Sequence, residues 1–520
     1  MAKMTGQQSI KAHNTKSVTG PKNWTVMIFL AADSNLALEM VFALKEMCRV
    51  GTTPDFNVFV RYDADGQFIP FEIKANQTGK GLGKAGFHLP QSGLDFNLLS
   101  QLRKSSSVPA KTAATPPLKK PNGSRKKNPR LDRTLVDFVS KTILHQGLNR
   151  RYMLVLSGHG TGAVGDFLAS DRPSSRLTIP RLGRVFRAVK KRIKKSDFKI
   201  DILGLDSCVM SMAEVVYEVQ PYVKVMVGSE GTEPSTGWNY AAVLNRLHNK
   251  PTADEEELSR AIVRDYLTYY KDFALGDVSV DQSALSLSTA NLEGLHAALR
   301  NLTTQLIGEL NSKAVRKVRN AILLAHWDAQ SYKFEQYTDL YDFCELLAKQ
   351  APKFKTNCKE VMKAIKNMTL LYGHAGAAFQ RSHGLSVFFP WASIEDPDGT
   401  RDLDYYADLQ FAKADHKFST QPKQPSVTNG WREFLEKCIA ATETPAIGKP
   451  SVCSRLNRRS VTLGGGKLGT PSNDRLGTPS NDRLGTPSND RGSLASGITA
   501  KIGQMKNPPI QFDPDAKPLP

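Results

Sequence analysis

Two side chains with the chemistry of a catalytic pair follow two short apolar segments. Tyr152–Leu156 is followed by His159, and Ile200–Leu205 is followed by Cys208. Short apolar runs rich in branched residues are typical of buried strands in a parallel sheet. Ligands of open α/β sheets bind at the carboxyl ends of the strands. The pattern therefore predicts a histidine and a cysteine that face each other across a cleft, as a thiol nucleophile and its acid–base partner do.

The residues around this pair fit the same chemistry. An expected helix from Ser211 onward would stabilise a Cys208 thiolate through its N-terminus, and His159 would protonate the leaving amine. Gly160 allows its N–H to turn toward the substrate carbonyl, where it would form an oxyanion hole with the N–H of Cys208. A buried cysteine or a packed histidine is the simpler explanation for either residue alone. The two together, each after a strand, favour a catalytic site.

The elements that must position these residues alternate along the first half of the chain. Further strands are expected at Trp24–Leu30, Phe56–Arg61 and Lys224–Val227, with helices between them such as Leu131–His145. This alternation predicts an α/β fold with a largely parallel, doubly wound sheet. After about residue 250 the pattern favours helices at Glu255–Tyr270, Leu292–Leu310, Ala314–Leu324 and Lys359–Leu371, and a strand at Gly384–Pro390.

Composition divides the chain into four parts. Residues 1–21 are polar and expected to be flexible, and residues 22–250 form the catalytic domain. That domain is interrupted at 104–130 by a stretch with eight basic and no acidic residues, which is expected to be disordered. Residues 251–441 form an α-rich region packed on the catalytic domain. Residues 442–520 form a low-complexity tail with three LGTPSNDR repeats, too poor in apolar residues to build a core.

Charge and cysteine content limit the classes of partner and compartment. The net charge of +20 could indicate nucleic acid, but the basic run Arg181–Lys195 has apolar residues at helical spacing, and no nucleic-acid recognition motif is present. The six cysteines form no CxxC pair, which argues against a zinc site and favours a reducing compartment. No apolar run reaches the roughly 18 residues of a membrane helix. A cytoplasmic protein is expected, and secretion by another route stays open.

Four segments carry a resemblance to a known family: WTVMIFLAADSNL, YMLVLSGHGTG, IDILGLDSCVMSMAEVVYE and GSEGTEPSTGWNY. They resemble the clostripain-like cysteine peptidases, which share a clan with caspases, gingipains and legumain. The resemblance runs from about Lys22 to Ala441. It implies a caspase-like three-layer α/β sandwich, and a dyad of His159 and Cys208 with no obligatory third member.

The resemblance also implies a specificity. The family often cleaves after arginine or lysine, and its specificity carboxylate lies two residues before the cysteine, at Asp206 here. A carboxylate there could pair with a guanidinium or ammonium group. The alternative is that Asp206 caps the following turn. Asp33, Glu230 and Trp238 are further candidates for lining the substrate cleft, and each could equally be structural.

The expected function is therefore a cysteine endopeptidase that acts through a thioester on protein or peptide substrates with Arg or Lys before the cut. Self-cleavage is implied by some relatives, and Arg176 is the candidate site, because Arg172 precedes a proline. No cofactor or metal is expected. Some relatives need calcium, but this sequence has no calcium-loop spacing, so calcium activation stays open. A monomer is favoured. The alternative function is a catalytically silent caspase-like scaffold used for binding.

Overall fold

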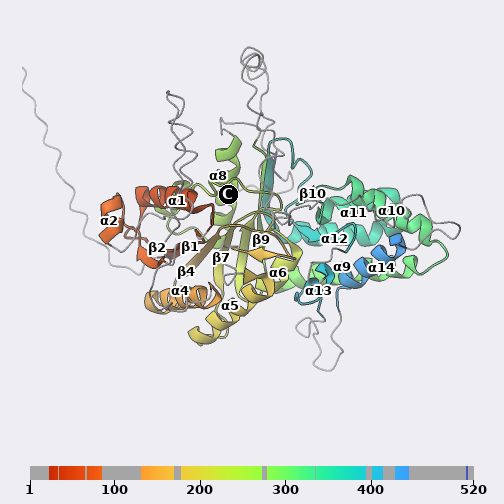
Figure 1. Ribbon diagram of the computed structural model, residues 1–520, viewed down its shortest axis with the longest axis horizontal. Helices are drawn as coiled ribbons and strands as arrows, with labels where there is room; N and C mark the ends of the chain where they lie inside the picture. The colour runs from red at the N-terminus through yellow and green to blue at the C-terminus, as the bar shows by residue number, and fades with distance from the viewer. Residues whose placement is uncertain are drawn as a thin grey trace, which may run out of the picture.

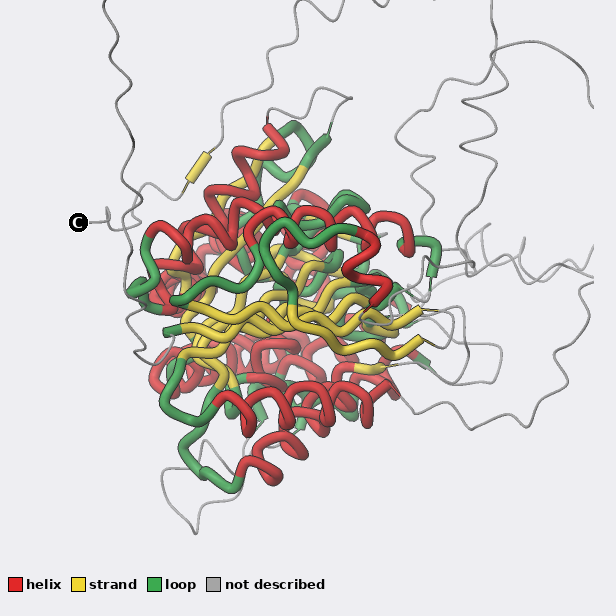
Figure 2. The backbone as a smooth tube through the Cα atoms, turned by 90° about the vertical axis from the view of Figure 1, so that its left-hand side faces the viewer, coloured by secondary structure: helices red, strands yellow, loops and turns green. Residues whose placement is uncertain are grey.

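The protein is built around one large sheet with helices on both faces. The computed structural model describes residues 23–32, 34–64, 67–84, 131–168, 177–271, 278–333, 335–393, 401–413, 428–443 and 511–512. Figure 2 shows the strands as a central layer between two layers of helices. The sheet has nine strands in the order β14-β12-β9-β8-β7-β4-β1-β2-β3.

The five central strands run parallel, and the outer strands are antiparallel to their neighbours. The parallel strands are β1 (Trp24–Leu30), β2 (Phe56–Ala64), β4 (Arg151–Ser157), β7 (Ile200–Asp206) and β8 (Val223–Gly228). The outer strands are β3 (Gln67–Glu72), β9 (Val280–Ser286), β12 (Thr369–Ala375) and β14 (Gln511–Phe512).

The parallel strands are apolar on both faces because helices cover both faces. Along β1, for example, Met27 and Phe29 pack into one core while Val26 and Ile28 pack into the other. The first core is covered by α4 (Leu131–Gln146), α5 (Ile179–Ile193) and α6 (Ala213–Val219). The second is covered by α1 (Ala37–Val50), α7 (Tyr240–Asn249) and α8 (Glu255–Lys271).

A helical lobe continues the first core beyond the edge of the sheet, to the right in Figure 1. It consists of α9 (Thr289–Leu310), α10 (Val315–Asp328), α11 (Leu340–Gln350), α12 (Lys355–Met368), α13 (Asp402–Tyr406) and α14 (Trp431–Glu443), with a short 3-10 helix at Pro352–Phe354. A three-stranded sheet lies between the lobe and the large sheet: β10 (Ser331–Tyr332), β11 (Tyr337–Asp339) and β13 (Ser386–Phe388). The remaining short elements are α2 (Gly79–Lys84), β5 (Asp166–Phe167) and β6 (Leu177–Thr178).

The expected α/β class with its largely parallel sheet is confirmed. The second half of the chain differs in detail. The helix expected at Lys359–Leu371 ends at Met368, because Thr369–Ala375 pairs with β9 and extends the large sheet. Helical periodicity does not reveal such an end, which is decided by pairing with a strand more than 80 residues away. The expected strand at Gly384–Pro390 shortens to β13 and joins the small sheet.

Several expectations fall on residues that lie outside the described ones: residues 1–21, the insertion 104–130 and the three repeats. Within the tail, which is expected to lack regular structure, Gln511–Phe512 pairs with β12 as strand β14. None of the described helices combines the length and the apolar composition that a bilayer crossing requires.

Candidate active site

The two loops that carry His159 and Cys208 leave the large sheet from neighbouring strands. Strands β4 and β7 are parallel partners, and Ser157 lies opposite Asp206 in their register. Beyond the last pair, the N–H of Gly158 donates to the carbonyl of Asp206 at 3.2 Å. The hydroxyl of Ser207 then donates to the carbonyl of Gly158 at 2.7 Å. Because the two strands are parallel and in register, both loops begin at the carboxyl end of the sheet.

Gly160 and Cys208 approach each other closely at the carboxyl end of the sheet. A Cβ atom on Gly160 would lie 2.2 Å from the carbonyl oxygen of Cys208, well inside van der Waals contact. The same Cβ would meet the side chains of Ser207 and Met210 at 3.1 Å. Only a residue without a side chain fits there. The loop after the histidine is therefore packed directly against the main chain of the cysteine loop.

The ring of His159 is held by a third loop. Its Nε2 atom lies 2.6 Å from Oδ1 of Asn35, in the loop between β1 and α1. Strand β1 is parallel to β4 and lies on the side of β4 opposite to β7. The carboxyl end of β1 therefore lies beside the carboxyl ends of β4 and β7. The carbonyl of His159 accepts the N–H of Leu168 at 2.8 Å, which closes the loop on itself. Asn35 was not singled out from the sequence, although the loop that contains it follows an expected strand.

The thiol of Cys208 is covered by the loop that follows β8. Its Sγ atom accepts the N–H of Glu233 at 3.3 Å, and the thiol faces the carbonyl of Glu233 at 3.6 Å. Burial raises the pKa of the Cys208 thiol to about 11, and the carboxyl groups of Glu233 and Asp206 act in the same direction. At neutral pH this conformation therefore holds a protonated thiol.

The sequence predicts a helix N-terminus next to the sulfur, and here the structure differs. Helix α6 begins at Ala213, five residues after Cys208, because Met212 first forms a bridge to Ser386 of β13. Between them Val209 has a φ angle of +52°, an unusual value for a β-branched residue. Its N–H donates to the carbonyl of Gly231, which fixes this turn. The sulfur therefore receives a single loop N–H and not the end of a helix.

Asp206, two residues before the cysteine, is buried and accepts hydrogen bonds from three neutral donors. Its carboxylate accepts hydrogen bonds from the hydroxyl groups of Ser157 (2.7 Å) and Tyr240 (2.6 Å) and from the N–H of Trp238 (3.1 Å). Burial raises the pKa of Asp206 in spite of these bonds. These donors come from β4, from the loop before α7 and from α7 itself, so Asp206 links the three segments.

A second carboxyl group, that of Glu233, lies beside Asp206. Burial and then the charge of Asp206 raise the pKa of Glu233 well above its usual range. Ser229 donates to Oε1 of Glu233 at 2.6 Å and Gln282 at 3.3 Å. Among the described residues no lysine or arginine pairs with either carboxyl group. Sequence analysis missed Glu233, although it follows the strand next to β7.

The other sequence-derived candidates are placed differently. Trp238 is buried and packs against Gly204 of β7, where a Cβ would lie 2.7 Å from its ring. Glu230 is fully buried, and its carboxylate accepts the N–H of Gly384 at 2.6 Å, which ties the β8 loop to the lobe. Both contacts are internal to the fold. Asp33 and Arg176 lie outside the described residues.

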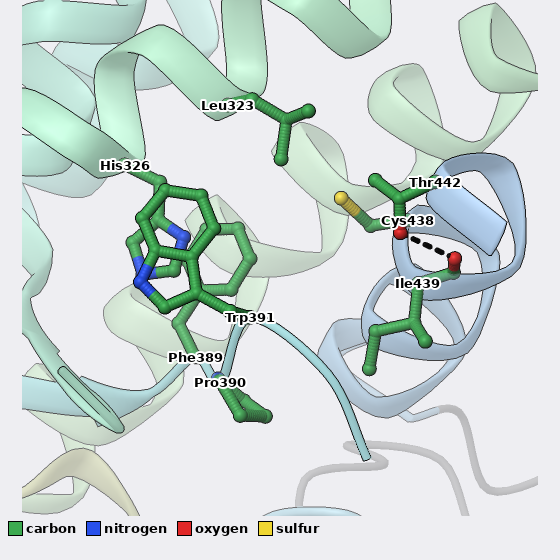
Figure 3. A pocket seen from close by; sticks show the side chains of 8 residues that line it. All are labelled: Leu323, His326, Phe389, Pro390, Trp391, Cys438, Ile439 and Thr442. Atoms are coloured by element: carbon green, nitrogen blue, oxygen red, sulfur yellow. Dashed lines mark hydrogen bonds between the residues drawn. The ribbon is translucent and has the colours of Figure 1, made fainter. Parts of the chain in front are cut away.

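A hollow with a different cysteine and histidine lies in the helical lobe (Figure 3). It lies between an aromatic stack and α14, and His326 and Cys438 are among its lining residues. The ring of His326 is stacked between Phe389 (4.0 Å) and Trp391 (4.1 Å). Burial lowers the pKa of His326 to about 4 and raises that of Cys438 to about 12. These are core groups without backbone donors arranged around the sulfur, and we do not assign them to catalysis.

Comparison with known proteins places both candidate loops in one matched region. The model of the clostripain family matches residues 130–431, more than half of the chain. Clostripain of Hathewaya histolytica is 21% identical over 425 residues, which cover 70% of this chain and 74% of the relative.

Two of the solved structures that resemble this chain are C11 proteases. An inactive zymogen C11 protease from Parabacteroides distasonis superposes with a TM-score of 0.50 at 17% identity, covering 75% of this chain and 97% of the other. A secreted C11 cysteine protease from Bacteroides thetaiotaomicron in complex with an irreversible peptide inhibitor gives a TM-score of 0.46 at 16% identity, covering 74% and 96%.

Proposed function

Because this chain belongs to the clostripain family of cysteine peptidases, we propose that it is an endopeptidase that cleaves after Arg or Lys through Cys208 and His159. The observation that carries the proposal is the interlocking of the two loops at the end of β4 and β7. The contact between Gly160 and the carbonyl of Cys208 sets the distance between the loops. The same contact supports an oxyanion hole made of the N–H groups of Gly160 and Cys208.

In the proposed reaction, Sγ of Cys208 attacks the scissile carbonyl carbon while its proton passes to His159. The imidazolium then protonates the leaving amine, and water hydrolyses the thioester. The hydrogen bond from His159 Nε2 to Asn35 supports a ring orientation in which Nδ1 exchanges the proton. Asn35 thereby takes the place of a third, positioning residue. Since burial keeps the thiol neutral, ionisation is expected to follow when substrate displaces the Glu233 segment from the sulfur.

The preference for basic residues rests on Asp206 and Glu233 together. Two buried carboxyl groups without a cation are costly, and an arriving guanidinium or ammonium would relieve that cost. A proton bound by the pair would leave as the substrate side chain enters. The donors Ser157 and Tyr240 hold Asp206 in place and are themselves neutral, so they do not compete with a substrate cation.

Self-cleavage is part of the proposal. Arg176 precedes Leu177, the first residue of β6, which pairs with β5 in the segment after His159. A zymogen is described for the relative from Parabacteroides distasonis.

The test compares reporter peptides with Arg, Lys, Asp or citrulline before the scissile bond. We expect hydrolysis of the Arg and Lys reporters by the wild type, loss of hydrolysis in Cys208→Ala and His159→Ala, and full activity in Cys48→Ala as a cysteine control. A folded wild type that hydrolyses none of the reporters after limited proteolysis would contradict the proposal. It would favour the silent scaffold instead.

A further inference from the structure

The main-chain carbonyl of Thr161, two residues after His159, receives two donors from the small three-stranded sheet. The hydroxyl of Tyr337 donates to it at 2.6 Å, and the ammonium of Lys333 donates to the same oxygen. The ammonium also lies 5.4 Å from the centre of the Tyr337 ring. Both donors come from the hairpin of β10 and β11, more than 170 residues away in the sequence.

The Tyr337 ring is inserted into the histidine loop and does not merely touch it. A Cβ on Gly162 would lie 2.4 Å from the ring, and Gly162 has a φ angle of +78°, which suits glycine. Tyr337 itself is fully buried. The loop and the ring therefore fix each other's position.

The position of Lys333 is costly for the protein. Its ammonium is half-buried, and burial lowers its pKa to about 8, with the charge of Asp166 opposing that shift. Its backbone also has a positive φ angle, +42°. Buried charge and unusual backbone at one residue are retained where the surrounding structure uses them.

The small sheet that carries this hairpin also contacts the cysteine loop. Strand β11 pairs with β13, and the N–H of Ser386 in β13 donates to the carbonyl of Ser211 at 3.0 Å. Met212 forms an isolated bridge with the same residue. One rigid three-stranded unit thus holds the segments that follow both His159 and Cys208.

We propose that Tyr337 and Lys333 are positioning residues, through which the small sheet sets the place of the His159 loop relative to Cys208. The catalytic part of this inference rests on the proposed peptidase function. The mechanical part, the fixing of the loop, does not. The two parts can therefore be tested separately.

The test uses Tyr337→Phe and a matched control in the same hairpin, Tyr332→Phe. Tyr332 is also buried, but its hydroxyl bonds to Ser382 at 2.6 Å and not to the histidine loop. Both changes remove one buried hydroxyl and keep the ring. We expect kcat to fall about five- to tenfold in Tyr337→Phe, with KM within twofold, as for loss of one hydrogen bond that orients a catalytic group. Tyr332→Phe should keep the wild-type kcat, and Lys333→Met should lower kcat as Tyr337→Phe does.

Hydrogen exchange gives a readout that does not require activity. The Leu168 amide donates to the carbonyl of His159, so its exchange rate reports how well the loop is held. Exchange should accelerate in Tyr337→Phe and stay unchanged in Tyr332→Phe. Equal exchange in the two variants, or equal loss of kcat, would overturn the inference. Faster exchange only in Tyr337→Phe, in a protein that cleaves no reporter, would keep the mechanical part and reject the peptidase assignment.

Discussion

Asp206 and Glu233 are the pair of residues to which the proposed substrate preference is assigned. Their carboxyl groups share a buried site in which burial raises both pKa values, and their partners among the described residues are neutral. A basic substrate side chain would be expected to displace any proton bound there. A neutral side chain of the same shape would gain nothing from the site.

Replacing these carboxyl groups should remove the discrimination between arginine and its neutral isostere citrulline. We expect kcat/KM for the Arg reporter to fall about a hundredfold in Asp206→Asn and about tenfold in Glu233→Gln, in line with the loss of charge-assisted bonds at a buried site. The citrulline reporter, if it is cleaved, serves as the matched control and should change little. An unchanged ratio of the two reporters in both variants would contradict a role of the pair in specificity.

Asn35 is the residue through which the orientation of His159 can be tested. Its side chain is exposed, so its replacement should leave the fold intact. We expect Asn35→Ala to lower kcat roughly tenfold at an unchanged KM, because the ring loses its orienting acceptor. Asn35→Asp keeps an acceptor at the same place and should recover most of the activity. A kcat in Asn35→Ala equal to that of the wild type would leave His159 and Cys208 as a true dyad.

At the scale of elements, the pairing of β5 with β6 bears on whether the new chain end would stay in place after self-cleavage. Leu177 is fully buried and pairs with Phe167, and the carbonyl of His159 is bonded to Leu168, the next residue after β5. A cut before Leu177 would therefore produce an end that is already fixed within the sheet pair. The two fragments should stay together, because β4 and β7 on either side of the cut are neighbours in the large sheet.

We expect active protein to yield a fragment that begins at Leu177, identified by N-terminal sequencing, and Cys208→Ala to remain intact. Both fragments should elute together under native conditions and separate only after denaturation. Arg176→Gln, which removes the basic residue before the cut, should abolish this fragment without affecting the fold. Full activity of a protein that stays intact would show that cleavage is not required.

At the scale of the whole molecule, Glu214 connects the layers. It lies on α6, fully buried, and its Oε1 atom accepts the N–H of Phe388 in β13 (2.9 Å) and the hydroxyl of Tyr406 in α13 (2.8 Å). Burial raises its pKa from 4.5 to about 7. The folded state therefore binds this proton more tightly than the unfolded state. The stabilisation is fully present below about pH 4.5 and is lost as the pH rises to about 7.

Glu214→Gln should remove this pH dependence, because a glutamine oxygen can accept the same two bonds. Relative to the wild type, we expect the free energy of unfolding of the variant to gain roughly 2–3 kcal/mol between pH 5 and pH 8. Thermal unfolding at both pH values measures the change. Glu436→Gln, which alters a surface carboxyl group on α14, is the control. The same pH dependence in Glu214→Gln and the wild type would show that Glu214 titrates normally in the fold.

Much of the parallel sheet could be predicted, and the two candidate residues could be located, because their signals are local. Strand Trp24–Leu30 is an almost continuous apolar run, and His159 and Cys208 each lie two residues beyond the end of a strand, β4 and β7. The end of α12 at Met368 and the strand that follows it could not be predicted. That boundary depends on pairing with β9, not on the residues themselves.

The sequence by itself determined the α/β class, the family and the two reactive loops, because apolar periodicity and residue type act over a few neighbouring positions. Only the tertiary structure decided that Asn35 contacts His159, that Glu233 covers the thiol and shares a site with Asp206, and that Tyr337 reaches the histidine loop. These contacts join residues from 25 to more than 170 positions apart. The contacts of Asn35 and Glu233 exist because strand order brings the carboxyl ends of β1, β4, β7 and β8 together, and the Tyr337 contact depends on the packing of the small sheet. No local pattern in the sequence records either arrangement.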